Sequence, residues 1–330
     1  MATLPRNLRY SDDSEPGISR RKRYGKWHYF QPEGERITCR DTIGRLNGLA
    51  VPPAYAGVWY CRHDNGHLQA TGRDEKGRKQ YRYHPEFRAA QEADKFSRTA
   101  AFGEALPEIR ARVEADLRRR NLSFERMLAA TVRMLDIGAL RVGNSGYART
   151  NGAYGATTLT KDHARVSGGS VHLNYTAKGG KTRDVHLSDG SLARLARRCQ
   201  DLPGQHLFAW QDQDGRSRGV SSGEVNDYIR SAMGEGFTAK HFRTWHASAI
   251  AYWEIVKADG DITLKAMLEP VAERLGNTIA ISRKSYVHPA LIECVKDGDC
   301  ADGPGLKLPQ KKKYLASYER GLIEFLHRRA

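Results

Sequence analysis

Five residues of this sequence have side chains that suit chemistry on a phosphodiester: Arg141, Lys178, Arg243, Asn277 and Tyr286. A guanidinium can bond two phosphate oxygens at once, and fixed cations stabilise the charge that builds up when a phosphate is attacked. An ammonium can give a proton to a leaving oxygen. Tyrosine is a weak nucleophile at its ordinary pKa of about 10, and neighbouring cations assist it. Together these types would suit attack of a tyrosine on a phosphodiester.

Each of the five also has a purely structural interpretation. Arg141 follows a predicted helix and could pair with a carboxylate, while Lys178 lies in a Gly-rich turn, where lysine is usually solvated. Arg243 lies on a predicted helix whose other face is apolar. Asn277 follows a glycine and could end a helix in the left-handed conformation. A lone tyrosine such as Tyr286 is more often a core residue than a nucleophile.

The charge of the chain favours a polyanionic partner. The 330 residues include 54 Lys and Arg against 38 Asp and Glu, a formal net charge of +16. So basic a chain is typical of nucleic-acid binding. The basic residues are spread over folded segments rather than one amphipathic helix, which disfavours a membrane surface as partner. We find no apolar run long enough to span a membrane and no apolar leader, so we expect a cytoplasmic protein.

The cysteines and carboxylates indicate neither a metal site nor a nucleotide site. The five cysteines are odd in number, form no CxxC pair, and Cys294 and Cys300 have a spacing that matches no zinc site. We therefore expect reduced structural thiols. The chain has no Walker-type loop and no carboxylate cluster. We expect no metal and no cofactor.

The N-terminal part is predicted to be a basic arm followed by a small β-rich domain. The arm covers residues 1–23 and ends in the basic run Ser19–Arg23. Residues 24–90 hold short extended segments separated by turn signals. These are Trp27–Phe30, Val58–Cys61, Leu68–Thr71 and Gln80–Tyr83, with a short helix at Asp41–Asn47.

Residues 91–330 are predicted to form a mainly α-helical domain with a three-stranded β patch, so the fold class is α+β. Pro107 would lie in a first helical turn, and Ser123 would cap a helix that runs through Leu135 and ends at Gly138. The predicted strands are His163–Ser167, Val171–Thr176 and Thr182–Leu187. The predicted later helices are Ser191–Arg198, Ser222–Ala232, Lys240–Val256, Leu264–Leu275 and Leu315–Arg328.

The five residues stand in segments that resemble one known family, the poxvirus-like bacterial type IB DNA topoisomerases. The resembling catalytic segments are Leu140–Asn144 with Asn151–Leu159, Tyr175–Lys181, Thr238–Ser248, Val271–Thr278 and Ile281–Tyr286. Asp41–Leu46, Ala50–Pro53, Gly66–Gly72 and Gly77–Tyr83 resemble the family's DNA-clamping domain. The resemblance runs from about Tyr24 to Leu291 in the family's order.

The resemblance implies a catalytic domain of the tyrosine recombinase and type IB topoisomerase type, and a reaction. Tyr286 would be the nucleophile, Arg141 and Arg243 would clamp the phosphate, and Lys178 would be the general acid. The products would be a 3′-phosphotyrosyl link and a free 5′-hydroxyl, and religation would relax supercoils without ATP or metal. Asn277 departs from the histidine of many relatives and keeps only the ability to donate an N–H.

The resemblance also implies how DNA would be held. The partner would be duplex DNA, bound by a monomeric clamp at the bacterial nucleoid. Gln80, Tyr81 and Tyr83 match positions that contact the major groove, and Lys240 is a further DNA-contact candidate. The alternation in this segment would place both tyrosines on one face of a strand, although a cross-strand aromatic pair is an alternative.

Two other functions remain open at this point. A tyrosine site-specific recombinase would use the same phosphotyrosine, but recombinases typically have histidine at the position of Lys240 and an all-helical N-terminal domain. A catalytically inert DNA clamp is the second alternative. An inert relative would have no reason to keep the two arginines, the lysine and the tyrosine together.

Overall fold

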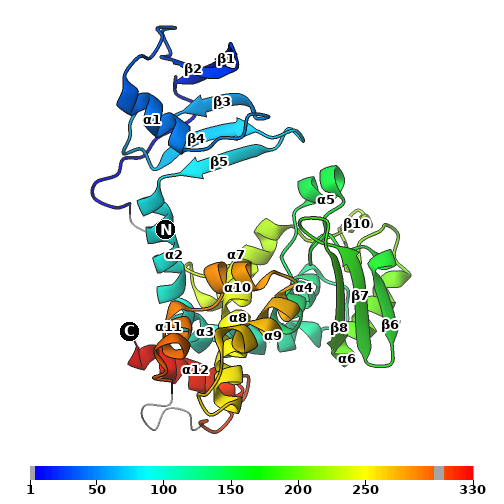
Figure 1. The fold of residues 1–330 in the computed structure, drawn as a ribbon. Helices are drawn as coiled ribbons and strands as arrows, with labels where there is room; N and C mark the ends of the chain where they lie inside the picture. Colours follow the sequence, from blue (N-terminus) through cyan, green and yellow to red (C-terminus); the bar gives the residue numbers. More distant parts are fainter. Residues whose placement is uncertain (1–3, 301–307, 330) are drawn as a thin grey trace. The chain divides into compact units, whose positions relative to one another are not determined.

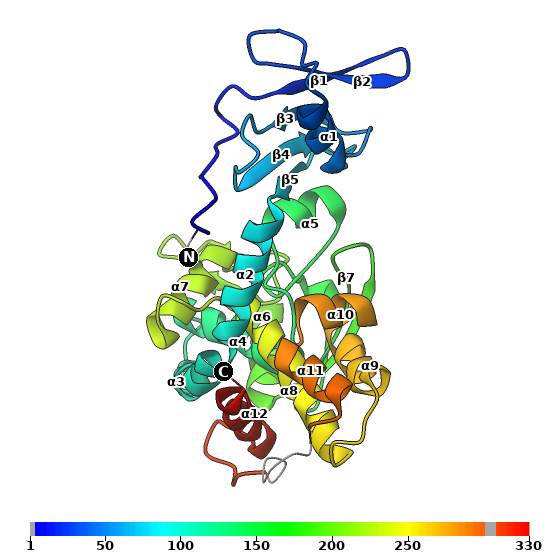
Figure 2. The same cartoon turned by 60° about the vertical axis from the view of Figure 1, so that its left-hand side comes forward.

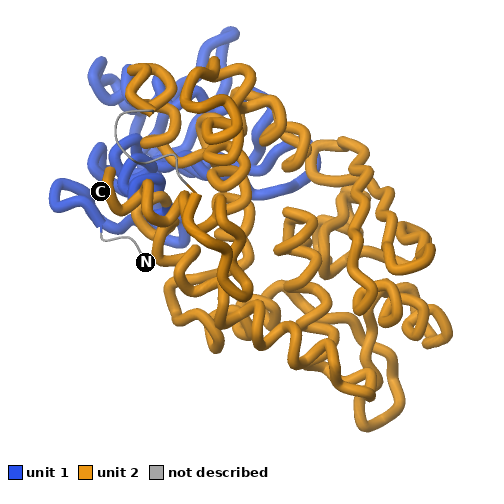
Figure 3. Tube along the Cα trace, turned by 90° about the horizontal axis from the view of Figure 1, so that it is seen from below, with its two compact units in different colours: residues 1–95 blue, residues 96–330 orange. Residues whose placement is uncertain are grey.

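The computed structural model describes residues 4–300 and 308–329 and divides into two compact units, Met1–Lys95 and Phe96–Ala330 (Figures 1 and 3). Each unit has its own hydrophobic core. Helix α2, Pro85–Ser97, contains the division between them. Because the side chains of each unit pack around a core of their own, each unit is described by itself.

The first unit is built on antiparallel strands, as the sequence predicted. A sheet of order β3-β4-β5 consists of Ala56–Tyr60, Leu68–Arg73 and Lys79–Tyr83. A separate hairpin pairs β1, Ser19–Arg23, with β2, Lys26–Phe30. Helix α1 spans Arg40–Gly48. The basic run that we expected in a free arm is thus a paired strand, because the Tyr24–Gly25 turn folds it onto the aromatic segment that follows.

The second unit is mainly helical and contains a three-stranded antiparallel sheet of order β6-β7-β8 (Figure 1). The strands are Ala164–Ser167, Ser170–Thr176 and Thr182–Ser188, within two residues of the predicted limits. A short pair joins β9, Trp210–Gln211, to β10, Ser217–Arg218, and a 3-10 turn covers Lys161–His163. The helices are α3 Thr99–Leu117, α4 Phe124–Gly138, α5 Ser145–Asn151, α6 Gly190–Gln200, α7 Ser222–Met233, α8 Ala239–Lys257, α9 Leu264–Leu275, α10 Ile279–Ser285, α11 Pro289–Asp297 and α12 Ser317–Arg328.

Helix α8 is the centre of the second unit. Helices α3, α4, α7, α9, α11 and α12 all pack against it (Figures 1 and 2). Most of its side chains are buried, and Phe242, Trp245 and Ala249 are at most 1% exposed. A helix that is buried on most of its sides is surrounded by other elements, even where some of its buried residues are polar. The buried polar residues of α8, Arg243 and Ser248 among them, are therefore held in a fixed place relative to several neighbouring elements.

The structure corrects several details of the predicted helices. Pro107 lies inside α3 rather than in its first turn, since the buried Phe102, Leu106 and Ile109 hold the helix on both sides of it. Helix α4 begins at its predicted cap, Ser123, but the left-handed residue that ends it is Ala139 instead of a glycine. The short helices α5, α10 and α11 were not predicted.

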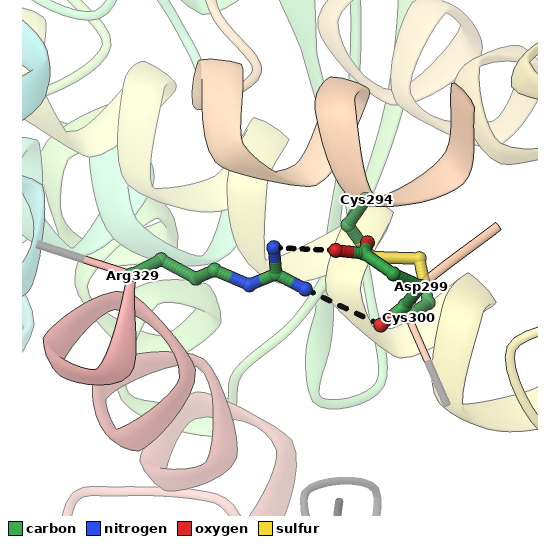
Figure 4. Close-up of a disulfide and its surroundings, with 4 residues drawn as sticks. All are labelled: Cys294, Asp299, Cys300 and Arg329. Atoms are coloured by element: carbon green, nitrogen blue, oxygen red, sulfur yellow. Dashed lines mark hydrogen bonds and ion pairs between the residues drawn. A yellow bond between two sulfur atoms is a disulfide. The ribbon is translucent and has the colours of Figure 1, made fainter. Parts of the chain in front are cut away.

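The prediction of reduced cysteines was wrong for one pair. The structure joins Cys294 to Cys300 by a disulfide, while Cys39, Cys61 and Cys199 are free thiols (Figure 4). Gly298 ends α11 in the left-handed conformation (φ 70°), and the chain turns back so that the two cysteine Cα atoms lie 4.9 Å apart. Spacing along the sequence does not reveal such a reversal. Arg329 also donates to the Asp299 carboxylate at 2.8 Å and to its carbonyl at 3.2 Å.

Two further properties concern the described part of the chain. None of its helices combines the length and the hydropathy that crossing a membrane requires. The described residues also contain no group of three or more His, Cys, Asp or Glu side chains that could hold a metal ion.

Candidate active site

Arg141 lies on a loop that is fixed by backbone hydrogen bonds. Its carbonyl accepts a hydrogen bond from the amide of Ala156 at 2.8 Å, and the carbonyl of Val142 accepts one from Thr157, also at 2.8 Å. Gly155 permits this close approach, because a Cβ there would lie 2.6 Å from the Arg141 carbonyl oxygen. The partly buried Arg141 side chain therefore leaves a well-defined point just beyond α4.

Arg243, on α8, joins the C-terminal ends of two other helices. Its Nη1 donates to the carbonyl of Ala139, just after α4, and its Nη2 donates to the carbonyl of Leu275, the last residue of α9, at 3.0 Å. The last carbonyls of a helix have no partner within the helix. The side chain is 4% exposed. Arg243 thus fixes the two loops that follow α4 and α9 relative to each other.

Asn277 follows the end of α9 and contacts Arg141. Gly276 ends the helix in the left-handed conformation (φ 63°), the role that the sequence left open for Asn277 itself. The Oδ1 atom of Asn277 accepts a hydrogen bond from Nη2 of Arg141 at 3.0 Å. Its Nδ2 is buried and has no partner among the described residues. The amide therefore has one end fixed by a cation and the other free to donate.

Tyr286 follows α10 and lies beside Arg243. The guanidinium carbon of Arg243 is 5.0 Å from the centre of the Tyr286 ring. The hydroxyl of Ser248, also on α8, accepts a hydrogen bond from the amide of His288 at 3.0 Å and is 3.5 Å from the Tyr286 carbonyl. One helix thus carries both the cation next to the phenol and the hydroxyl that holds the backbone on either side of it.

The arginines and the Tyr286 phenol shift each other's pKa. Burial, together with the nearby charge of Arg141, lowers the pKa of Arg243 to about 10, so its guanidinium stays charged at neutral pH. Burial alone would raise the pKa of Tyr286. The charges of Arg243 and Arg141 and their hydrogen bonds outweigh it, and the pKa of Tyr286 lies below its ordinary value. A phenol that ionises more readily is a better nucleophile.

Lys178 is the one predicted catalytic residue that the structure does not bring into contact with the others. It is exposed in the turn between β7 and β8, where the amide of Gly180 donates to the carbonyl of Ala177 at 3.1 Å. Among the described residues, no hydrogen bond or ion pair joins it to the two arginines, the asparagine or the tyrosine. The structure thus brings four of the five predicted residues together.

Arg183 belongs to the same cluster, and our sequence reasoning missed it. It lies on β8, and its Nη1 and Nη2 donate to the carbonyls of Glu273 and Arg274, in the last turn of α9, at 3.2 and 2.8 Å. Its guanidinium packs directly under Gly276, where a Cβ would lie 2.4 Å from Nη1. It therefore ties the sheet to the helix end that presents Asn277.

A signal for Arg183 was present in the sequence. Strand β8 alternates exposed and buried residues, and Arg183 takes a buried position in series with Val185 and Leu187. A charged residue at a core-facing position of a strand is rarely buried without partners. Its partners could not be predicted, because they lie 90 residues further along the chain.

The DNA-contact candidates lie in different surroundings. Tyr81 and Tyr83 are on one face of β5, as predicted, with stacked rings 6.0 Å apart and 46% and 39% exposed. They stack on each other along the strand, so they are not a cross-strand pair. Gln80 donates to the carboxylate of Asp74 at 3.0 Å. Lys240 is exposed in the first turn of α8, in the second unit.

Comparison with known proteins covers most of the chain. The family model of the catalytic core of eukaryotic DNA topoisomerase I matches residues 84–286. The model of the N-terminal domain of bacterial DNA topoisomerase IB matches residues 26–74. Among curated proteins, DNA topoisomerase 1B of Acanthamoeba polyphaga mimivirus is 32% identical over 289 residues, which are 82% of this chain and 85% of the relative. DNA topoisomerase 1B of Vaccinia virus (strain Copenhagen) is 23% identical, over 70% of this chain and 74% of its own.

Among the solved structures that are similar to this chain is a XerH site-specific recombinase bound to a palindromic difH substrate, 16% identical, with a TM-score of 0.37, covering 55% of this chain and 47% of the recombinase.

Proposed function

This chain belongs to the type IB DNA topoisomerases, and from that premise we propose that it relaxes supercoiled duplex DNA through a transient covalent bond to Tyr286. The phenol oxygen would attack the scissile phosphorus as the bond to the 5′-oxygen breaks. The phenol would give its proton to solvent, and one strand would be left with a 3′-phosphotyrosyl link and a free 5′-hydroxyl. Rotation of the free end followed by the reverse attack would change the supercoiling.

One observation carries this proposal. Two buried N–H groups of the cluster have no partner among the described residues: Nε of Arg243, whose guanidinium lies beside the phenol, and Nδ2 of Asn277, whose Oδ1 contacts Arg141. A buried donor without an acceptor costs free energy, so such groups are rare in native structures. A phosphate at this place would supply acceptor oxygens to both. It would also receive the charge of Arg141, whose side chain already touches Asn277.

The same arrangement accounts for the expected catalysis. Charge that develops on the non-bridging oxygens would meet guanidinium and amide donors that the ends of α4 and α9 already hold in place. Preorganised donors of this kind lower a barrier because they need not reorient during the reaction. Asn277 would act only by donation, since an amide cannot take up or release a proton at neutral pH.

We propose Lys178 as the general acid for the departing 5′-oxygen. Its place in an exposed turn leaves its ammonium free of protein partners among the described residues. The two glycines that follow it, Gly179 and Gly180, both have positive φ, which lets the turn present the lysine at its tip. The leaving oxygen would take its proton from this ammonium.

We further propose that the protein is a monomer that forms a clamp around duplex DNA, at the bacterial nucleoid. Gln80, Tyr81 and Tyr83 would contact the major groove, and Lys240 a phosphate. The exposed, stacked tyrosines support this proposal, because a tyrosine pair with no core to fill is suited to an interface. Most of the affinity should come from phosphates and fall steeply with salt.

The decisive experiment is plasmid relaxation by Tyr286→Phe. The substitution removes only the hydroxyl, so duplex binding should stay close to that of the unchanged protein while relaxation and the 3′-linked protein–DNA adduct disappear. Relaxation near the normal rate would refute the assignment. The same assay should proceed in EDTA without ATP, and strict dependence on either would indicate a different enzyme class.

A second experiment tests Lys178. Lys178→Ala should slow cleavage of an ordinary duplex but not of one that carries a 5′-bridging phosphorothiolate, because sulfur leaves without needing a proton. Lys181→Ala, in the same turn region, is the matched control and should cleave both substrates normally. If the phosphorothiolate does not restore the rate, Lys178 is not the general acid.

A further inference from the structure

The β1–β2 hairpin ends in an unusual turn. Tyr24 and Gly25 are its two central residues, and both have positive φ, 49° and 77°. This is the conformation of a two-residue type I′ turn, in which Asn or Asp is the usual first residue. A tyrosine pays a conformational cost there. Tyr24 is also fully exposed, at 101%. A bulky aromatic residue held in a strained conformation with nothing of its own protein to contact suggests a function.

One face of the hairpin anchors it to the first unit. Arg20, Lys22, Trp27 and Tyr29 share this face, since Arg20 pairs with Tyr29 and Lys22 with Trp27. Tyr29 belongs to the core of the unit, and Trp27 packs against that core. The Arg20 guanidinium lies 4.1 Å from the Trp27 ring centre and donates to the carbonyl of Val51 at 2.8 Å. The hairpin is therefore a fixed projection.

The other face is basic and has no acidic partner. It presents Arg21, Arg23, Lys26 and His28, because Arg21 pairs with His28 and Arg23 with Lys26. Arg21, Arg23 and Lys26 are exposed, and no carboxylate of the described residues lies within ion-pair distance of any of them. Arg21 and Arg23 leave the strand roughly 7 Å apart, so they can reach different phosphates of one DNA strand.

We infer that this outer face and its tip form a DNA-contact surface of the first unit, in which Arg21, Arg23 and Lys26 bind backbone phosphates and Tyr24 packs against the sugars and base edges of a groove. The inference rests on the proposed DNA substrate. It concerns residues outside the catalytic cluster and outside the candidates on β5. Strand β1 also precedes residues 26–74, the segment that the bacterial N-terminal family model matches.

The inferred phosphate contacts are tested by the salt dependence of duplex binding. Binding is measured on the full chain with Tyr286→Phe, which prevents cleavage. Each phosphate contact contributes about 0.9 to the slope of log K against log salt. Replacing Arg21, Arg23 and Lys26 together by Gln should lower the slope by about 2–3 and weaken binding about tenfold or more near 0.15 M salt. An unchanged slope would overturn the inference.

A pair of single variants separates contact from general electrostatic attraction. Arg23→Gln and Lys22→Gln remove the same charge from neighbouring positions on opposite faces of one strand. Arg23→Gln should lower the slope by about 0.9, and Lys22→Gln should leave it nearly unchanged. Equal effects of the two variants would show that the face is not a contact surface.

Tyr24→Asn tests the tip without endangering the fold. Asparagine suits the left-handed position better than tyrosine, so the urea midpoint should not fall. Duplex affinity should fall about fivefold with an unchanged salt slope, because the phenol carries no charge. Affinity within twofold of the parent would refute a contact by Tyr24. If the parent protein with an intact hairpin does not bind duplex DNA, the proposed function fails; if it binds and the hairpin variants bind equally well, only this inference fails.

Discussion

Replacing Arg183 by alanine should slow cleavage by acting through Asn277. The change removes two donations from a buried guanidinium, to the carbonyls of Glu273 and Arg274, in the turn that leads into Asn277. Hydrogen bonds to a charged group contribute about 1.5–3 kcal/mol each, and water can replace part of the loss at a helix end. We expect the free energy of unfolding to fall by about 2–4 kcal/mol.

The effect on the reaction has an upper limit. Loss of one preorganised donor to a developing oxyanion typically slows a reaction by about 10²–10³-fold. If Arg183 acts only by placing the Asn277 amide, Arg183→Ala should slow single-turnover cleavage by no more than Asn277→Ala does. In a protein that already carries Asn277→Ala, the further loss should be less than about threefold. Arg183→Lys, which keeps the charge and one donation, should be intermediate.

A matched control removes the ambiguity between positioning and general loss of stability. Arg126 is also buried, and it also donates to two carbonyls, those of Arg120 and Asn121, at 3.3 and 3.2 Å. Arg126→Ala should lower the urea midpoint to a similar extent and leave the single-turnover rate unchanged. The reasoning is refuted if Arg183→Ala cleaves at the normal rate while folded, or if its effect adds in full to that of Asn277→Ala.

Arg243→Gln removes the cation that lowers the pKa of Tyr286, so the rise of the cleavage rate with pH should move to higher pH; an unchanged single-turnover profile would contradict this. Gly276→Ala should be more destabilising in urea than Gly298→Ala. Both residues have positive φ, which costs about 1–2 kcal/mol for alanine, but only the first added Cβ would meet a side chain. Burial alone would raise the pKa of Asp136, but its ion pair with Arg110 holds the pKa well below its ordinary value. Its stabilisation is therefore present at neutral pH and is lost as the pH falls below about 4. Asp136→Asn should cost about 3–5 kcal/mol at pH 7, and its urea midpoint should vary less between pH 3 and 7 than that of the unchanged protein.

The local elements could be predicted because their signals are local. Alternation in Val171–Thr176 and Thr182–Leu187, with glycines between, predicted two strands of the sheet to within a residue. The segment Leu264–Leu275 was predicted with its exact limits, since a threonine precedes it and a glycine follows it. Helices α5 and α10 were missed because seven residues are too few for helical periodicity to stand out.

The sequence by itself determined which side chains are present, their order, and the elements that carry them. It also determined the basic charge that favours a polyanion. The tertiary structure decided which of those side chains meet. Arg243 bridges carbonyls 104 and 32 residues away, and Arg141 reaches an amide 136 residues away. No periodicity extends over such separations, because these contacts arise only when helix ends pack around α8. The same packing lowers the pKa of Tyr286, so the tyrosine is an expected nucleophile in the sequence and acquires the surroundings of one only in the fold.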